Sequence, residues 1–194
     1  DLVRSRGLGD VYKRQRRTLM DVLSDVYDGT KYDLTKLPSG DPFADVTPDY
    51  ALCRRGTLSS IVADYTPETG SVLWTAIATP RMSFYMPLYV DIDGLPAFCE
   101  TFLPGEGENT SLFWEFKKLC ILTQRRFARH MEITGKAKRE WEAHAAAVLA
   151  AHSRDMAQLP ESGRRAARTK FDRAVLTSAL ETCRETRRAL LLQY

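Results

Sequence analysis

The sequence has no apolar run close to the roughly 20 residues that a helix needs to cross a bilayer, which argues against a membrane protein. It has only four cysteines and three histidines. No cysteine forms a C-x-x-C pair or stands at metal-ligand spacing from a histidine, so a zinc site and a disulfide framework are both disfavoured. We expect no metal and no other cofactor. We expect the cysteines to be small buried hydrophobes; they are Cys53, Cys99, Cys120 and Cys183.

The histidines and glycines also lack the spacing of a binding site. We predict that His130, His144 and His152 are ordinary helix-surface residues. The last two would share a helix face two turns apart, too far apart to hold one ion. The glycines of 105–109 are not followed by the Lys-Ser/Thr pair of a phosphate-binding loop. The chain also has no internal repeat and no low-complexity segment.

Residues 1–15 are predicted to be a non-native tail. Residues 5–15 read as the translation of a transposase-type sequencing adapter, over too many consecutive codons for chance. We therefore expect the natural reading frame to enter near Arg16, part-way through a gene. The Gly7-x-Gly9 pair then carries no nucleotide-binding signal. The missing start methionine says nothing about location, and a cytoplasmic protein is the working expectation.

The composition is ordinary for a soluble globular domain, with 44% hydrophobic and 27% charged residues. The charge is uneven along the chain. Residues 16–110 hold 7 lysines and arginines against 14 acidic residues, whereas residues 111–194 hold 17 against 9. Such asymmetry can mark a nucleic-acid-binding arm. We favour basic helices that pack beside an acidic sheet or a partner subunit, because acidic residues interrupt the basic stretch and no aromatic platform accompanies it.

The periodicity predicts a helix, then a sheet. Thr18 can cap the first helix and Gly29 can end it. Residues 30–54 read as a long irregular stretch that is functional or well packed. Residues 57–65 and 71–78 read as a hairpin whose strands are apolar on both faces, so the sheet should be covered on both sides. The expected apolar stripe of the first helix is Leu19, Val22, Leu23, Val26 and Tyr27.

Residues 83–92 alternate as a third strand, and Pro87 suggests an edge strand or a bulge there because proline has no N–H to donate. Three helices should follow. Further helices are expected over about 136–158 and 163–192. The stripe of the helix that begins near residue 112 is Phe113, Phe116, Cys120, Phe127 and Met131; that of the last helix is Leu176, Leu180, Cys183, Leu190 and Leu191.

Six short motifs follow one another along the chain. They are Asp25-Val26-Tyr27-Asp28-Gly29-Thr30-Lys31-Tyr32-Asp33-Leu34-Thr35-Lys36, Asp41-Pro42-Phe43-Ala44, Arg54-Arg55-Gly56-Thr57-Leu58-Ser59-Ser60, Gly70-Ser71-Val72-Leu73-Trp74, the residues Pro80, Ser83, Tyr85, Pro87 and Tyr89, and Phe113-Trp114-Glu115-Phe116. In this order and spacing, residues 16–194 resemble the N-terminal-nucleophile cysteine dipeptidases, to which the secernins are related. Asp64, Asp41 and Ala44 depart from the family pattern, which has a glutamine and two glycines there, and could alter substrate preference.

The resemblance implies an α/β (α+β) fold: part of an αββα N-terminal-nucleophile hydrolase sandwich with a helical C-terminal extension. Residues 16–110 would be the C-terminal part of the core, and residues 111–194 a helical region packing on it. In this family a cysteine at the mature N-terminus attacks a dipeptide, with its own α-amino group as base. The four cysteines here are interior to the chain and have no free α-amine. By the resemblance, the nucleophile is absent and this chain is inactive alone.

The same resemblance suggests substrate-binding residues on the first strand. Arg54 and Arg55 could hold a dipeptide carboxylate, although a solvated strand entrance is the simpler interpretation. Thr57, Ser59 and Ser60 form a row of small hydroxyls that could hydrogen-bond substrate, although we slightly favour cross-strand hydrogen bonds inside the sheet as their role. We expect no catalytic residue in this chain.

Four more residues have expected structural roles, and other functions stay open beside the dipeptidase interpretation. Trp74 and Tyr85 should be core residues, while Asp33 and Lys36 should order the loop around them. An amidase or acyltransferase of the same superfamily stays open, as does a non-enzymatic basic helical interaction module whose binding would fall with salt. The expected partners are a dipeptide or small peptide substrate and a possible second copy of the chain, with no nucleic acid and no membrane.

Overall fold

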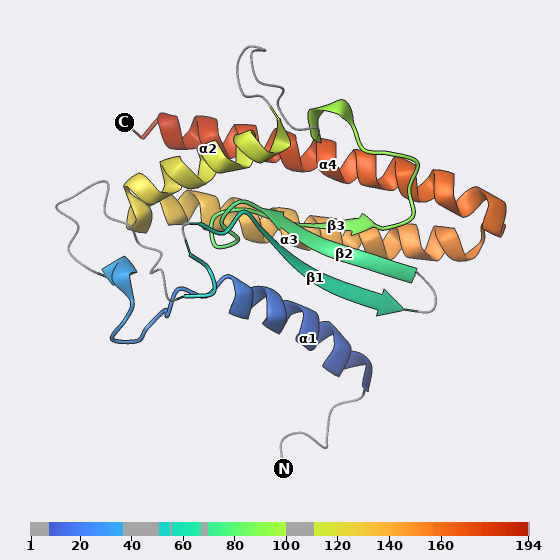
Figure 1. Cartoon of the computed structure of the whole chain (residues 1–194), viewed down its shortest axis with the longest axis horizontal. Helices are drawn as coiled ribbons and strands as arrows, with labels where there is room; N and C mark the ends of the chain where they lie inside the picture. The colour runs from blue at the N-terminus through green and yellow to red at the C-terminus, as the bar shows by residue number, and fades with distance from the viewer. Residues whose placement is uncertain (1–7, 37–50, 55, 67–69, 100–110, 194) are drawn as a thin grey trace.

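The computed structural model describes residues 8–36, 51–54, 56–66, 70–99 and 111–193, without the side chains of 8–15, Lys36 and Thr66. In this part of the chain a three-stranded antiparallel sheet packs against four helices (Figure 1). The predicted mixed α/β (α+β) class is confirmed, and the arrangement agrees with part of an αββα sandwich. The elements are α1 (Leu8–Leu23), η1 (Leu34–Lys36), β1 (Ser59–Thr66), β2 (Gly70–Ile77), β3 (Tyr85–Tyr89), η2 (Ala97–Cys99), α2 (Leu112–Arg125), α3 (Phe127–Ala157) and α4 (Glu161–Leu191).

The predicted hairpin is confirmed. β1 pairs antiparallel with β2, from Ser59 opposite Ile77 to Thr66 opposite Gly70. Gly70 has a φ of +76°, a left-handed conformation that only glycine adopts without strain, so it suits the end of the turn. β2 pairs with β3 on its other side, so Pro87 lies in an edge strand of the described sheet, the first of the two predicted alternatives.

In the described part of the chain, helices cover one face of β1 and leave the other open. Val62 is buried on the face that also carries Trp74, directly opposite it in the sheet. On the other face Ile61 is 52% exposed and Tyr65 is 72% exposed. The prediction that the sheet is covered on both sides is therefore wrong for β1. Apolar residues on both faces of a strand show that it can be covered twice, but not which neighbouring element does so.

α1 differs from the predicted first helix at both ends. It begins at Leu8, well ahead of Thr18, because the chain between 10 and 17 has no glycine or proline to stop it. It ends at Leu23 rather than at Gly29. The chain beyond it is a tight turn, in which the backbone of Thr30 donates to the carbonyl oxygen of Tyr27.

The predicted apolar stripe of this helix is partly wrong. Met20 is buried, whereas Leu19 and Val22 are 49% and 45% exposed. Val26 is buried but lies beyond the helix, where Tyr27 already has a φ of +64°. The face of α1 that meets the sheet is therefore rotated from the one that the spacing indicated.

The three C-terminal helices pack against one another beside the sheet. α3 and α4 both contact β3, while α1 contacts β1. The break between α2 and α3 falls at Arg126 rather than near residue 136. Neither glycine nor proline marks the break. Instead, the hydroxyls of Thr123 and Thr134 meet across it at 2.9 Å, and Gly135 lies inside α3.

α4 agrees with the predicted last helix in extent. Leu176, Leu180, Cys183 and Leu190 are buried as expected. Leu191 is 52% exposed, so the prediction is wrong for the last member of the stripe. It stands at the final residue of the helix.

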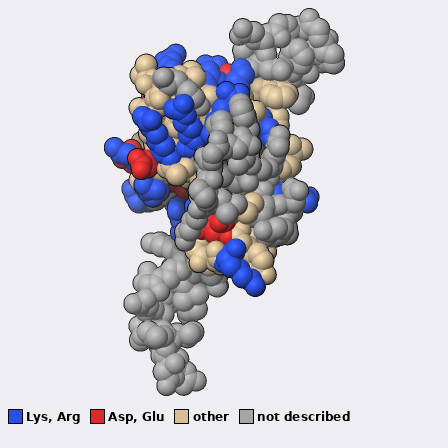
Figure 2. Space-filling model, turned by 90° about the vertical axis from the view of Figure 1, so that its left-hand side faces the viewer, with Lys and Arg blue, Asp and Glu red and all other residues tan. Residues whose placement is uncertain are grey.

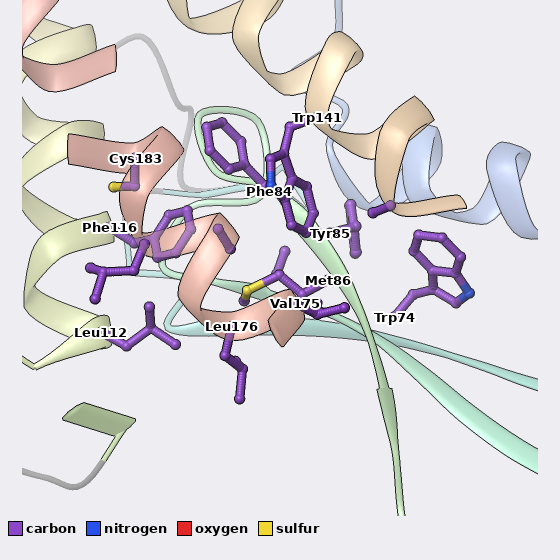
Figure 3. Close-up of a cluster of buried hydrophobic side chains, with 14 of the residues drawn as sticks. Trp74, Phe84, Tyr85, Met86, Leu112, Phe116, Trp141, Val175, Leu176 and Cys183 are labelled. Atoms are coloured by element: carbon purple, nitrogen blue, oxygen red, sulfur yellow. The ribbon is translucent and has the colours of Figure 1, made fainter. Parts of the chain in front are cut away.

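The core lies where the helical layer meets the end of the sheet (Figure 3). The Phe84 ring meets Phe116 of α2 edge to face at a centroid distance of 5.4 Å and stacks on Trp141 of α3 at 5.8 Å. Trp74 and Tyr85 are buried, as predicted for core residues. Burial of these large apolar surfaces is the main term that stabilises the fold, at roughly 25 cal/mol per Å².

Basic helices and acidic loops pair with each other, as the favoured interpretation of the charge asymmetry predicted. Arg165 of α4 lies 2.7 Å from Asp93, and Arg168 lies 3.5 Å from Asp91, in the loop after β3. Both pairs join α4 to the sheet. Lysine and arginine side chains are nevertheless prominent on the face that Figure 2 presents.

Asp172 is a buried carboxylate that reaches from α4 to the edge of the sheet. Its two oxygens lie 3.0 and 3.1 Å from the backbone nitrogen of Tyr89, which donates to them. Burial raises the pKa of Asp172 to about 7, although the hydrogen bond from Tyr89 opposes the shift. The charged form of this carboxyl is therefore the costly one in the folded protein.

This shift predicts a pH dependence of stability. Because the folded-state pKa lies above the unfolded value near 3.8, the stabilisation is complete below about pH 4 and is lost as pH rises through about 7. Asp172→Asn keeps an acceptor for Tyr89 and removes the charge. We expect it to flatten the pH profile and to stabilise the fold at pH 8 by roughly 1–3 kcal/mol, after allowing for solvent screening.

Urea unfolding at pH values from 4 to 8 measures this. The matched control is Glu181→Gln, which neutralises an exposed acid on the same helix and should leave the profile of the parent chain unchanged. An Asp172→Asn profile parallel to that of the parent would contradict the assignment.

Candidate functional site

A cavity of about 610 Å³ lies between α1, α3 and the chain around Arg81. A volume of this size suits a small organic molecule. Its wall combines charges of both signs with a few apolar side chains. The lining residues are Arg17, Thr18, Asp21, Val22, Ser24, Asp25, Tyr27, Asp28, Leu52, Arg81, Met131, Gly135, Lys138 and Arg139.

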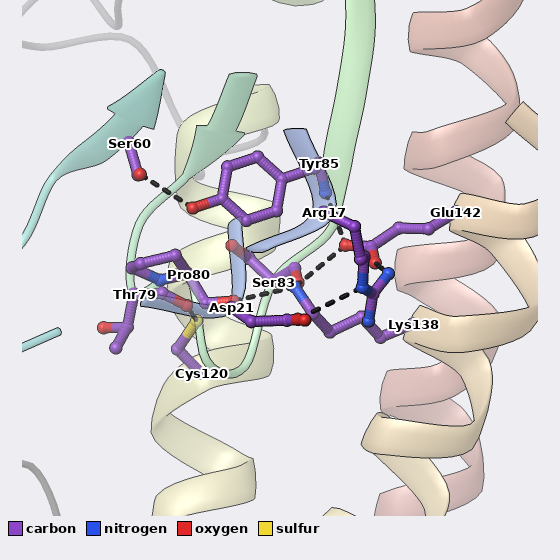
Figure 4. A network of polar contacts seen from close by, with 10 residues as sticks. All are labelled: Arg17, Asp21, Ser60, Thr79, Pro80, Ser83, Tyr85, Cys120, Lys138 and Glu142. Carbon is purple, nitrogen blue, oxygen red and sulfur yellow. Dashed lines mark hydrogen bonds and ion pairs between the residues drawn. The ribbon is translucent and has the colours of Figure 1, made fainter. Parts of the chain in front are cut away.

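A buried ion network joins the elements around this cavity (Figure 4). Glu142 of α3 accepts hydrogen bonds from the backbone nitrogen of Tyr85 at 3.0 Å and from Arg17 of α1 at 2.9 Å. Its other contact is Lys138, one turn earlier on α3, at 2.9 Å. A single carboxylate thus holds α1, α3 and the start of β3 together.

Lys138 is the buried cation of this network. Its ammonium donates to the carbonyl oxygens of Pro80 at 2.9 Å and Ser83 at 2.7 Å. Burial lowers the pKa of Lys138, while the charge of Glu142 opposes the shift. All three ammonium protons are engaged, so this lysine positions the loop between β2 and β3.

Tyr85 connects the network to β1. Its hydroxyl lies 2.8 Å from the hydroxyl of Ser60, and its ring lies 4.9 Å from the Lys138 ammonium. Burial raises the pKa of Tyr85, so the phenol stays protonated at neutral pH and can donate a hydrogen bond. Ser60 and Tyr85 therefore form a neutral hydroxyl pair beside the charged network.

The loop after α1 is ordered by Asp33, as the sequence predicted. Asp33 is buried and accepts hydrogen bonds from the backbone of Gly29 at 2.8 Å and of Thr35 at 3.0 Å. Arg81 then ties the loop to the β2–β3 connection through Asp28, at 2.8 Å. The side chain of Lys36, the other predicted loop residue, lies outside the described residues.

The structure separates the predicted substrate-binding residues. Ser59 is exposed, and Ser60 points to the opposite face of β1 toward Tyr85, because successive strand residues alternate. Arg54 is exposed, and its backbone nitrogen donates to the Thr57 hydroxyl at 3.2 Å. The three hydroxyls therefore do not form one row.

Arg55 lies outside the described residues. The charged residues that line the cavity were missed by sequence reasoning. Lys138 and Glu142 stand four residues apart on a predicted helix, which resembles an ordinary surface pair. Nothing in the sequence shows that they are buried.

The histidines differ from their prediction. His130 is fully buried, with Nδ1 2.7 Å from the carbonyl oxygen of Leu122, so its assignment to the helix surface is wrong. His152 is half-buried and lies 3.2 Å from the Tyr89 hydroxyl, which also corrects the prediction. His144 is exposed as expected. Among the described residues no cluster of His, Cys, Asp and Glu could hold a metal ion.

The cysteines do not have the character of nucleophiles. Cys53, Cys120 and Cys183 are buried as predicted, whereas Cys99 is only partly buried. Burial raises the pKa of Cys53 and Cys99 to about 11 and that of Cys120 to about 12. Burial raises the pKa of Cys183 as well. A nucleophilic cysteine needs thiolate character at neutral pH, and none of these four has it.

This predicts how the thiols react. With Ellman's reagent at pH 8, we expect the native chain to label slowly and only at Cys99, and all four thiols to react in denaturant. Cys99→Ser should then abolish native labelling. Rapid native labelling of Cys53 would contradict the assignment, since its thiol is fully buried.

The comparison with known families gives the decisive observation. The model of peptidase family C69 matches residues 16–140. The chain belongs to peptidase family C69. Every residue that lines the cavity falls within the matched range.

Membership of family C69 confirms the resemblance that the six motifs indicated, and at this level the chain belongs with peptidases, which are hydrolases. A comparison with curated proteins found no match. None of the described helices is long and apolar enough to cross a membrane.

Proposed function

We propose that this chain is the C-terminal part of a cysteine-type dipeptidase, whose nucleophile is a cysteine at the mature N-terminus and lies outside these residues. The observation that carries the proposal is the C69 match, which covers residues 16–140. The position of the cysteines in the chain and the raised pKa of their thiols support it. Each cysteine of this chain is interior, and burial raises the pKa of each thiol above its ordinary value.

The proposed chemistry explains why such a cysteine must be terminal. A free α-amino group has a pKa near 8 and can take the thiol proton at neutral pH. The thiolate attacks the peptide carbonyl, the amine of the leaving residue departs, and water releases the acyl group. An interior cysteine has no α-amine to act as this base. The chain alone is therefore inactive in this proposal.

Within this chain we propose that β1 contributes to substrate binding rather than to bond cleavage. Ser60 is the best placed of the predicted residues, because its hydroxyl pairs with Tyr85 on the covered face. Arg54 is exposed and free to reach a carboxylate. Arg55, Thr57 and Ser59 stay predictions.

The test is an activity assay on dipeptides with two proteins. One is this chain, and the other is the reading frame extended upstream of Arg16 from an independently sequenced locus. We expect cleavage by the extended protein only, and loss of cleavage when its N-terminal cysteine is replaced by alanine. Cleavage by this chain alone, or an extended frame without such a cysteine, would overturn the proposal.

An amidase or acyltransferase of the same superfamily would share the chemistry and differ in substrate, so simple amides belong in the assay panel. The basic helical module is less well supported. Arg184 and Arg187 lie 3.3 and 2.7 Å from the buried carboxylate of Glu115, and Arg165 pairs with Asp93. These cations stabilise the fold and are not free for an acidic partner.

A further inference from the structure

The two outer strands of the described sheet, β1 and β3, differ in the state of their free edges (Figure 1). The edge of β3 is closed by side chains of α3 and α4. Glu142 accepts the outward backbone N–H of Tyr85 at 3.0 Å. Asp172 accepts that of Tyr89 at 3.0 and 3.1 Å, and between them Pro87 has no N–H to donate. A further strand beside β3 would therefore find its donors engaged or absent.

The edge of β1 is open in the described part of the chain. The carbonyl oxygen of Leu58 accepts the backbone N–H of Ala78 at 2.8 Å, so the even-numbered residues of this strand direct their backbone groups toward β2. The odd-numbered residues direct theirs away from the sheet. These residues are Ser59, Ile61, Ala63 and Tyr65. No other described segment makes a hydrogen bond to their backbone groups.

β1 also lacks the features that keep edge strands from pairing. It contains no proline and no lysine, and its continuous register with β2 leaves no bulge. On its uncovered face, Ile61 and Tyr65 are 52% and 72% exposed. Asp64 is the only charged residue of the strand, and it lies on the covered face, where Arg16 pairs with it at 2.8 Å. The strand therefore presents an unpaired edge with apolar, uncharged side chains beside it.

We propose that β1 pairs antiparallel with β1 of a second copy of this chain, across a two-fold axis at Ala63. This register pairs residues 60–66 of both copies, nearly the whole strand. It sets Ile61 opposite the partner's Tyr65, and Tyr65 opposite the partner's Ile61, on the uncovered face. A β-branched side chain directly opposite an aromatic one stabilises an antiparallel pair.

The neighbouring registers fit less well. An axis at Asp64 would bring this carboxylate opposite the partner's Asp64, and like charges directly opposite each other are destabilising. An axis at Val62 would place Tyr65 opposite the partner's Ser59 and lose both aromatic pairs. The sequence of β1 therefore favours the axis at Ala63.

The closed edge of β3 limits the assembly to two copies. Pairing through β1 gives one continuous sheet in the order β3-β2-β1-β1-β2-β3, whose outer strands are both β3. A contact that uses the same surface of both copies closes on itself and leaves no further site. Because one strand pair is a small interface, we expect a dissociation constant on the order of 10 µM. The proposal does not depend on catalysis by a longer protein.

Sedimentation velocity of this chain at increasing concentration tests the proposal. We expect a monomer–dimer equilibrium. Ile61→Lys and Tyr65→Glu should each weaken it about tenfold, because each variant places a charge opposite an apolar side chain twice in the dimer. A mixture of the two variants should recover dimers, since one pair becomes lysine opposite glutamate and the other remains Ile61 opposite Tyr65. Only this register joins the two substituted positions.

Val90→Lys is the matched control. Val90 is 61% exposed and follows β3, so the same kind of substitution at the closed side of the sheet should leave the equilibrium unchanged. Circular dichroism melting shows that each variant is folded. In the parent chain, exchange of the Ala63 amide hydrogen should slow only at concentrations at which the dimer forms.

Four outcomes would overturn the proposal. They are a chain that stays monomeric, dimers that both Ile61→Lys and Tyr65→Glu leave unchanged, a variant mixture that recovers no dimer, and growth beyond two copies. Protection of the Ala63 amide in a monomer of the protein extended upstream of Arg16 would also overturn it, because a strand of the same chain would then occupy the edge. Dipeptide cleavage by that extended protein is measured separately, and none of these results would contradict it.

Discussion

Glu142→Ala is expected to lower the free energy of unfolding by about 3–5 kcal/mol, a large part of the total for a domain of this size. Glu142 is 5% exposed and accepts from Tyr85, Arg17 and Lys138. Without it, the Lys138 ammonium remains buried with no counter-charge, and the Tyr85 N–H loses its acceptor. Urea unfolding followed by circular dichroism measures the loss.

One variant separates charge from hydrogen bonding at this position, and a second variant nearby serves as the control. Glu142→Gln keeps an acceptor for Tyr85 and should cost less than the alanine variant. Glu140→Ala removes an exposed acid of the same helix, whose oxygen lies 3.9 Å from Lys136, and should change stability by less than about 0.5 kcal/mol. Equal losses in Glu142→Ala and Glu140→Ala would contradict the buried network.

The stability of Glu142→Ala is also predicted to depend on pH. The charge of Glu142 opposes the lowering of the Lys138 pKa, so its removal lets that pKa fall further. A lysine whose folded-state pKa is depressed binds fewer protons when folded than when unfolded, so stability rises with pH. The deficit of Glu142→Ala should therefore shrink as pH is raised, and a deficit independent of pH would argue against a buried ammonium.

Phe116→Ala should cost about 3–5 kcal/mol, because it empties the centre of the contact between α2 and the sheet. Phe116 is fully buried and meets Phe84 edge to face at 5.4 Å. Loss of this ring removes both the buried apolar area and the aromatic pair. The measured quantity is the urea midpoint, together with amide exchange in α2.

Trp114→Ala is the matched control, two residues away on the same helix. Trp114 is 36% exposed and contacts Phe113, at a ring centroid distance of 5.4 Å. Its replacement should cost about 1 kcal/mol. If the two variants lost similar stability, α2 would not be packed with the Phe116 side inward.

Local sequence patterns were enough to predict the hairpin and the last helix. A turn rich in Thr, Pro and Gly between two β-prone runs predicted the hairpin, and the missing N–H of Pro87 limited its strand to an edge or a bulge. Both depend on interactions within a few residues of each other in sequence. The predicted apolar stripe of α4 is buried, for the same reason, except at Leu191, where the helix ends.

Helix ends and helix faces were less predictable. The break at Arg126 has no glycine or proline, and the Thr123–Thr134 pair across it forms only when α3 has folded back on α2. The buried face of α1 was likewise misassigned, since Leu19 is exposed and Met20 is buried. Helical periodicity defines several similar faces, and the partner element selects one.

The sequence by itself determined the family, the mixed α/β class and the hairpin, because these follow from motif order, period and turn chemistry. It also showed that no cysteine here has a free α-amine. Only the tertiary structure decided which charges are buried. Lys138 and Glu142 have the spacing of a surface pair, yet packing of α1 and β3 against α3 removes them from water. Burial depends on contacts between segments more than 50 residues apart, such as Tyr85 with Glu142, and no local pattern encodes it.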